Sequence, residues 1–112
     1  MMKLYIAVLD DAPDYMVPTL VAHSMLGAHL RFAELETYND WLKTSFRKCV
    51  VRVNRKEFDK IKDTMNVYLG HENTICDGQK SCVIPLPVRS DEVPNVLKYA
   101  KLWKPKNNVQ LV

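Results

Sequence analysis

The stretch CVVRVNRKEFDKIKDTMNVYLG, residues 49–70, predicts a strand, a helix and a second strand in close succession. Apolar residues alternate from Cys49 to Val53, as in a strand with one buried face. Asn54 followed three residues later by Glu57 is the pattern of a capping box, which begins a helix. The spacing then predicts the buried stripe of that helix: Phe58, Ile61 and Met65. The second strand is VYLG, so these residues form a βα unit.

The stretch KLYIAVLD, residues 3–10, is apolar on both alternating faces. Such a strand is covered on both sides, which places it in the middle of a sheet in a layered α/β protein. A helix is expected over 17–36, with Pro18 in its first turn, where the missing N–H costs nothing. Residues 38–46 are expected to hold a short turn of helix or a loop.

The last third of the chain predicts a strand over 81–88 and a helix from Ser90 to about residue 103. Pro85 and Pro87 cannot donate to a ladder, so the second half of that strand lies at an edge or leaves the sheet. The predicted fold is a single α/β domain over 1–112. It is a three-layer sandwich with a mixed sheet of about four strands and helices on both faces.

The composition, with 47% apolar and 26% charged residues, is that of a soluble globular protein. No apolar run approaches the roughly 18 residues of a membrane span, and the start of the chain lacks the pattern of a signal peptide. These features predict a cytoplasmic protein with no membrane contact. The cysteines, Cys49, Cys76 and Cys82, form no CxxC pair and are expected to be buried thiols, so neither a metal nor a cofactor is predicted.

The positive charge is concentrated in residues 43–62, where eight basic and two acidic residues give a net charge of +6. A solvated charged face explains such a segment, and so does a footprint for RNA or another acidic partner. The residues predicted to bind RNA are Lys43, Arg47, Lys48, Arg52, Arg55 and Lys56.

Three carboxylates, Asp10, Asp11 and Asp14, follow the first strand and form what we call the acidic loop. The loop has no glycine and would repel phosphate, so it does not predict a nucleotide site. It could hold a hard cation, but the favoured interpretation is that these residues order the turn and complement the dipole of the next helix.

Several separated pieces resemble the type 2 peptidyl-tRNA hydrolases: LYIAVLDD, the pair Ala22–His23, the 49–70 unit, and VIPLPVRSDEVPNVLKYAKLW. The resemblance implies a mixed four-stranded sheet with helices on both faces. It also implies a substrate of peptidyl-tRNA, cleaved at the ester that joins the peptide to the tRNA 3′ end. The positions that match the catalytic residues of this family are Asp11, His23 and, more loosely, Asp77.

The chain departs from this family at the strand-to-helix loop, which is glycine- and lysine-rich in the family and is APDYMVP here. Leu20 stands where the family has a glutamine. A lysine would stabilise a developing oxyanion, whereas carboxylates would not, and carboxylates also weaken the attraction for a phosphate chain. These departures make hydrolase activity doubtful and imply either a different activity or a fold retained for binding, with tRNA or other RNA as a partner through the basic segment 43–62. We further expect His23 to support the loop by hydrogen bonding, and not to act as a general base.

The alternative is a non-enzymatic module that self-associates, as a homodimer, or binds another protein. Trp41 and Trp103 beside basic residues motivate it, because tryptophan is enriched at interface hot spots.

Overall fold

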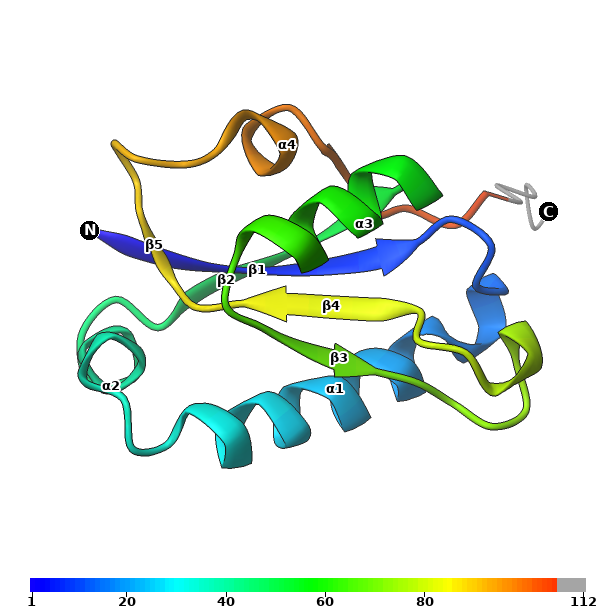
Figure 1. Ribbon diagram of the computed structural model, residues 1–112, viewed down its shortest axis with the longest axis horizontal. Helices are drawn as coiled ribbons and strands as arrows, with labels where there is room; N and C mark the ends of the chain where they lie inside the picture. Colours follow the sequence, from blue (N-terminus) through cyan, green and yellow to red (C-terminus); the bar gives the residue numbers. More distant parts are fainter. Residues whose placement is uncertain (107–112) are drawn as a thin grey trace, which may run out of the picture.

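The computed structural model describes residues 1–106 and shows a mixed α/β fold with a six-stranded sheet (Figure 1). The strand order is β3-β4-β1-β2-β6, and β5 pairs with β1 off this path. The strands are β1 (Met2–Leu9), β2 (Arg47–Val53), β3 (Val67–Gly70), β4 (Cys82–Pro85), β5 (Val88–Arg89) and β6 (Lys101–Leu102). The helices are α1 (Val17–Phe32), α2 (Glu36–Lys43), α3 (Arg55–Thr64) and α4 (Asn95–Lys98), with short 3₁₀ turns η1 (Asp14–Met16) and η2 (Cys76–Gly78).

Strand β1 lies in the middle of the sheet, as its two apolar faces predict. It runs parallel to β2 from Lys3 to Leu9 and antiparallel to β4. Its alternate residues enter two separate apolar clusters. Leu4, Ile6 and Val8 belong to the first, and Tyr5, Ala7 and Leu9 to the second. Both faces of the strand are therefore buried.

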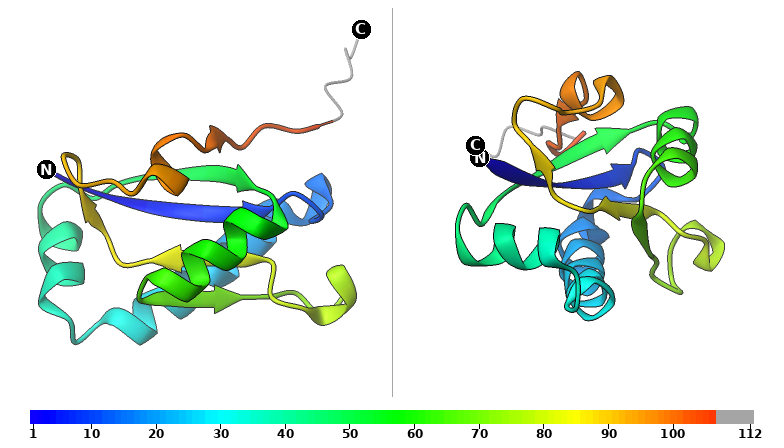
Figure 2. Two further views of the ribbon diagram at one scale, coloured as in Figure 1. Left: turned by 45° about the horizontal axis from the view of Figure 1, so that its top comes forward. Right: turned by 60° about the vertical axis from the view of Figure 1, so that its left-hand side comes forward.

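The two clusters bring helices onto opposite faces of β1 (Figure 2). Helix α1 buries Leu20, Ala28 and Phe32 in the first cluster, which also receives Trp41 of α2. Helix α3 buries Phe58 and Ile61 in the second. The burial of alternate residues of one strand against different helices is what the apolar pattern of 3–10 requires.

The start of α3 is as predicted. The side chain of Asn54 accepts from the N–H of Glu57, and the side chain of Glu57 accepts from the N–H of Asn54, each at 2.8 Å. Val53 and Phe58 belong to the same apolar cluster, as a hydrophobic staple requires. Two of the four orphan N–H groups near this helix end are thereby satisfied locally.

The sheet has six strands rather than about four, because two strands of two residues each escape detection from sequence. Strand β5 resumes the path of β4 after a break at Leu86–Pro87 and pairs with Met2 and Lys3. The strand expected over 81–88 is thus interrupted at Leu86–Pro87, but its second half returns to the same sheet as β5 and does not leave it. The helix expected over 17–36 ends at Phe32, and α2 begins at Glu36, where only a turn or loop was expected from residue 38.

The long helix predicted over 90–103 is wrong. Pro94 precedes a helix of only four residues, and the chain then extends to form β6. Strand β6 pairs antiparallel with Val51 and Arg52 of β2, and the N–H of Trp103 donates to the carbonyl of Val50 at 2.9 Å. Residues 101–103 therefore form backbone hydrogen bonds with the open edge of β2 instead of hydrogen bonds within a helix. Within residues 1–106, no helix has the length and apolar character needed to cross a membrane.

Candidate functional site

The acidic loop lies at the carboxyl end of β1, where open α/β sheets place their ligands. The N–H of Asp10 donates to Val53 at the end of β2, and the N–H of Ala12 donates back to Leu9 at 3.0 Å. These bonds turn the chain sharply from β1 towards η1 and leave Asp11 exposed. These backbone hydrogen bonds form the turn without a glycine.

Asp14 is engaged by the segment that follows β6. Its carboxylate lies 3.5 Å from Nη2 of Arg52 and accepts a hydrogen bond from the N–H of Lys106. The ammonium group of Lys106 donates to the carbonyl of Asp10, and Nη2 of Arg52 donates to the carbonyl of Lys104. Residues 103–106 thus cross the acidic loop and bring positive charge to Asp14 and Asp10.

Arg52 is a partly buried residue of this crossing, with 18% of its side chain exposed. Its guanidinium lies 5.2 Å from the centre of the Trp103 ring, which places a cation over an aromatic face. The side chain is therefore held between Asp14, the Lys104 carbonyl and Trp103. Of the residues predicted to bind RNA, it is the one least available to a ligand.

The 3₁₀ turn η2 carries Cys76 and Asp77. The pKa of the Cys76 thiol is raised by burial first and then by the charge of Asp11, Arg55 opposes the shift, and Asp77 adds a smaller raising effect. Cys76, Asp77 and Gly78 have positive φ angles of 49°, 53° and 74°, so the backbone turns tightly here. No contact joins Asp11 to Asp77 among the described residues, so the two carboxylates are related only through their electrostatic effect on this thiol.

His23 lies elsewhere. It pairs through Nδ1 with Oε1 of Glu72, in the loop after β3, and 65% of its side chain is exposed. It lines a pocket of about 280 Å³ with Ser24, Tyr68, Gly70, His71, Glu72 and Asn73. Within the described residues, that lining includes no carboxylate of the acidic loop and not Asp77. The expectation that His23 bonds to a carboxylate fits this geometry, but its partner is not part of the acidic loop.

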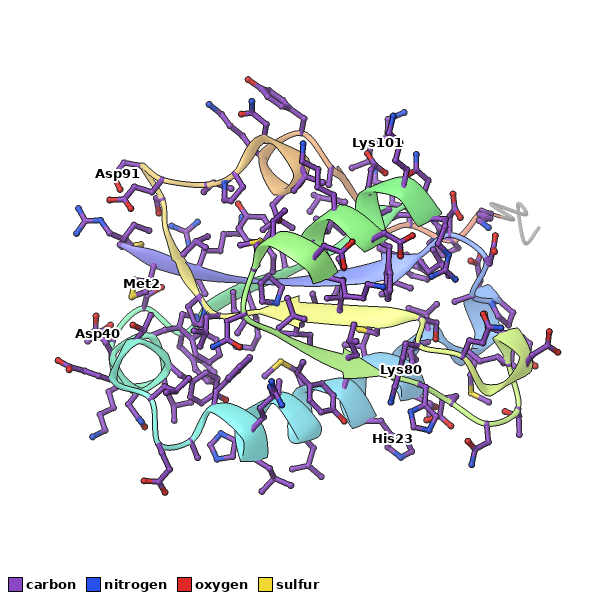
Figure 3. All side chains as sticks on the ribbon, viewed as in Figure 1. Met2, His23, Asp40, Lys80, Asp91 and Lys101 are labelled. Carbon is purple, nitrogen blue, oxygen red and sulfur yellow. The ribbon has the colours of Figure 1, made fainter. Side chains whose placement is uncertain are left out.

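Two basic residues at this pocket were missed at the level of sequence: His71, which lines it, and Lys80, which lies beside His71. Nζ of Lys80 lies 3.0 Å from Nδ1 of His71, and Figure 3 shows Lys80 and His23 on the same side of the molecule. The one sequence signal for His71 and Glu72 is that they directly follow the strand predicted at VYLG, residues 67–70. Nothing local in the sequence joins that loop to α1.

The pocket has an oriented base but no activated nucleophile. Ser24 and Ser81 are fully buried, and neither hydroxyl is hydrogen-bonded to a histidine or a carboxylate among residues 1–106, although that of Ser24 interacts with the Cys82 thiol. Burial raises the pKa of the Cys82 thiol to about 12, which keeps it protonated and inert. The pair His23–Glu72 could therefore orient an imidazole towards water, but it forms no Cys–His or Ser–His dyad.

The six predicted RNA-binding residues fall into two groups. Lys43, Arg47 and Lys48 lie at or before the amino end of β2, and Arg52, Arg55 and Lys56 lie at its carboxyl end. Seven strand residues separate the ends by about 20 Å. Lys48 folds back over Phe46, with Nζ 3.3 Å from the ring centre. A ligand at one group does not reach the other without spanning the strand.

A larger groove of about 1280 Å³ lies at the opposite end of the sheet, around Met1, α2 and β5. Its charged residues are mixed in sign: Glu36, Asp40, Lys43, Arg89 and Glu92. It is a broad and open surface feature that includes none of the residues matched to the hydrolase family. We therefore do not assign the site to it.

No group of three or more His, Cys, Asp or Glu side chains within residues 1–106 is arranged to hold a metal ion. Compared with known proteins, the chain matches no protein-family model and shows no significant match to a curated protein. The assignment of a functional site therefore depends on the chemistry and positions of the residues of this chain. Asp11 and Asp77 both raise the pKa of the Cys76 thiol, and His23 lies in a pocket whose lining includes neither of them.

Proposed function

We propose that this chain is a peptidyl-tRNA hydrolase-like domain, a three-layer α/β sandwich, that binds RNA at the carboxyl end of β2 and does not cleave the peptidyl-tRNA ester efficiently. The mixed sheet, in which β1 runs parallel to β2 and antiparallel to β4, supports the family resemblance. The surface residues of the binding site are Arg55 and Lys56, with lysines from the segment around β6.

The observation that carries this proposal is the position of Arg55 and Lys56 in the first turn of α3. The helix dipole favours acidic side chains there and disfavours cations. Both side chains are exposed, and the ion pair of Arg55 with Asp59, at 3.7 Å, is half exposed and therefore weak. Arg55 also contacts the ring of Phe58, with its guanidinium 5.2 Å from the ring centre, but the charges themselves contribute little to folding. We expect this of a surface that binds an anionic ligand.

The segment after α4 adds charge to the same end of the sheet. The register of β6 places Lys101 directly opposite Arg52, and Lys104 follows within three residues. Lys101 and Lys104 are exposed. A phosphate backbone that contacts several such cations gains affinity by releasing counterions, without requiring a base-specific contact.

The site is poorly equipped for ester cleavage. Asp11 and Asp77 both raise the pKa of the Cys76 thiol, His23 faces Glu72, and the acidic loop is crossed by residues 103–106. A developing oxyanion at this loop would face carboxylates instead of a lysine. Binding without efficient turnover is the function that fits these positions.

The test is the salt dependence of tRNA binding, measured by fluorescence anisotropy on the full chain. The double variant Arg55→Glu/Lys56→Glu should weaken binding at least tenfold at low salt and reduce the slope of log K against log salt by about 2. Glutamates in the first turn of a helix are favourable, so the loss would not come from unfolding of α3. The matched control, Lys43→Glu/Arg47→Glu, changes the same charge at the other end of β2 and should bind nearly as the wild type does.

Two results would overturn the binding proposal: no tRNA binding at low ionic strength, or equal losses in both double variants. The catalytic part is tested separately with peptidyl-tRNA. We expect turnover no faster than the uncatalysed background. Turnover that disappears in a stably folded His23→Gln variant would show instead that His23 is catalytic.

A further inference from the structure

Residues 104–106, which we call the strap, follow the last backbone contact with β2. The N–H of Trp103 donates to the carbonyl of Val50, and beyond it no backbone–backbone hydrogen bond holds the strap within residues 1–106. The strap is held instead by bonds that involve side chains: Arg52 to the Lys104 carbonyl, the Lys106 N–H to Asp14, and the Lys106 ammonium to the Asp10 carbonyl. A charged ligand that competes for these side chains would therefore displace the strap.

The Asp14 carboxylate lies among donors that suit a phosphate group. One of its oxygens lies 3.5 Å from Nη2 of Arg52, and the other accepts from the N–H of Lys106. Guanidinium groups and backbone N–H groups are the donors that proteins commonly use for phosphate oxygens. Asp14 therefore occupies a position where the same donors would stabilise a phosphate.

Two further donors at this place have no acceptor. Nη1 of Arg52 and Nε1 of Trp103 are buried, and neither has a hydrogen-bond partner among residues 1–106. They belong to one contact, since the guanidinium lies 5.2 Å from the centre of the Trp103 ring. Buried donors are nearly always paired, and an unpaired one is costly. Both oxygens of Asp14 are already engaged, whereas a phosphate has more oxygens than a carboxylate and directs them tetrahedrally.

We propose that Arg52, Trp103 and the N–H of Lys106 form the binding site for one phosphate group of the RNA, and that Asp14 occupies this site when no RNA is bound. The inference rests on the proposed function, because it takes the RNA backbone as the source of the phosphate. On binding, the phosphate replaces the Asp14 carboxylate and accepts from the same donors and from the two unpaired ones. Asp14 is thus an internal competitor of the ligand.

The exchange leaves the guanidinium paired throughout. The side chains of Arg52 and Asp14 are only 18% and 24% exposed, so removing the partner of either is costly. A phosphodiester carries the same single negative charge as the carboxylate that it replaces. The released carboxylate turns to solvent from η1, none of whose residues is buried. Lys101 and Lys104, which are exposed, are then close enough in the chain to contact neighbouring phosphates.

The first experiment compares two variants that each remove one carboxylate from the acidic loop, with tRNA affinity measured by fluorescence anisotropy on the full chain. Asp14→Asn removes the competing charge and should tighten binding by about tenfold or more. The matched control, Asp11→Asn, removes the same charge at an exposed position and should tighten binding by less than about threefold. Circular dichroism checks that each variant is folded at the temperature used. Equal changes in the two variants, or weaker binding by Asp14→Asn, would overturn the proposal.

The second experiment tests the donors. Arg52→Lys keeps the charge but loses the planar fork, so in this background Asp14→Asn should tighten binding no more than Asp11→Asn does. Trp103→Phe keeps an aromatic ring but loses the Nε1 donor, and it should weaken tRNA binding by Asp14→Asn about fivefold. Full retention of tight binding in both combined variants would show that these donors do not hold a phosphate.

Inorganic phosphate separates this inference from the proposed function. At constant ionic strength, phosphate should change the tryptophan fluorescence of Asp14→Asn but not that of Asp14→Asn/Trp103→Phe, in which Trp41 is the remaining tryptophan. Such a change without any tRNA binding would overturn the proposed function and RNA as the source of the phosphate. Conversely, tRNA binding that is lost in Arg55→Glu/Lys56→Glu but unaffected by Asp14→Asn would support the proposed function and overturn the phosphate site.

Discussion

Gly70 of β3 packs directly against Ser24 of α1: a Cβ atom added to Gly70 would lie 1.9 Å from Oγ of Ser24 and 2.8 Å from its Cβ. Because Gly70 has no side chain, α1 can lie close to the sheet at this point, beside the pocket that His23 lines. Both residues are buried, so neither has room to move away.

Gly70→Ala should therefore lower the free energy of unfolding by about 1–3 kcal/mol, the usual cost of overpacking. Urea denaturation measures it. Ser24→Ala in the same chain should recover part of the loss, because it removes the closest atom. Strictly additive effects of the two substitutions would show that this contact does not set the distance between helix and sheet.

The capping box of α3 leads to a second prediction. Asn54→Ala removes the acceptor for the N–H of Glu57 and should cost about 1 kcal/mol of stability. Lys60→Ala, at an exposed position of the same helix, should change stability by less than about 0.5 kcal/mol. Equal urea midpoints for the two variants would contradict a stabilising role for the cap.

Cys82 should make the protein less stable in alkali. Burial raises the pKa of its thiol from 9.0 to about 12, so above pH 9 the unfolded chain loses this proton and the folded chain keeps it. The free energy of unfolding should then fall with rising pH, by about 1.4 kcal/mol per unit from this group alone between pH 9 and 12. Cys82→Ala should show a shallower alkaline slope in urea titrations, whatever its stability at pH 7. Identical slopes would mean that the thiol ionises without unfolding.

The contact of Asp14 with Arg52 gives a prediction for the acidic loop. Asp14→Asn leaves a partly buried guanidinium without its carboxylate and should cost about 1–3 kcal/mol. Hydrogen exchange at the N–H of Trp103, which is bonded to Val50, should quicken as residues 103–106 loosen. Asp11→Asn, at an exposed carboxylate of the same loop, is the control and should leave exchange at Trp103 unchanged.

The elements that could be predicted from sequence are those whose causes are local. The two apolar faces of 3–10 place β1 in the sheet, and Asn54 with Glu57 begins α3, because each signal lies within a few residues. The region after Ser90 has apolar residues at helical spacing, yet Pro94 delays the helix and the open edge of β2 captures residues 101–102 as β6. Competition between a helix and a distant strand edge is decided by tertiary structure.

The candidate site, like the fold, was predictable only where its cause is local in the sequence. The acidic loop follows a predicted strand, so its place at the sheet edge could be inferred from topology. The partner of His23 could not, because Glu72 comes from a loop far away in the chain. Trp41 was a candidate interface residue from its neighbours, but it is buried, and its indole donates to the carbonyl of Arg47 at 2.7 Å.

The pairing of β6 with β2 has a consequence for synthesis on the ribosome. Strands β1, β2, β3 and β4 are all complete before residue 101, so a nascent chain can assemble most of its sheet while β2 is still an outer strand. Only when Lys101–Trp103 leave the exit tunnel is the backbone of Val50, Val51 and Arg52 covered. The interval before that moment is when the newly made chain is most exposed to association with its neighbours and most in need of a chaperone.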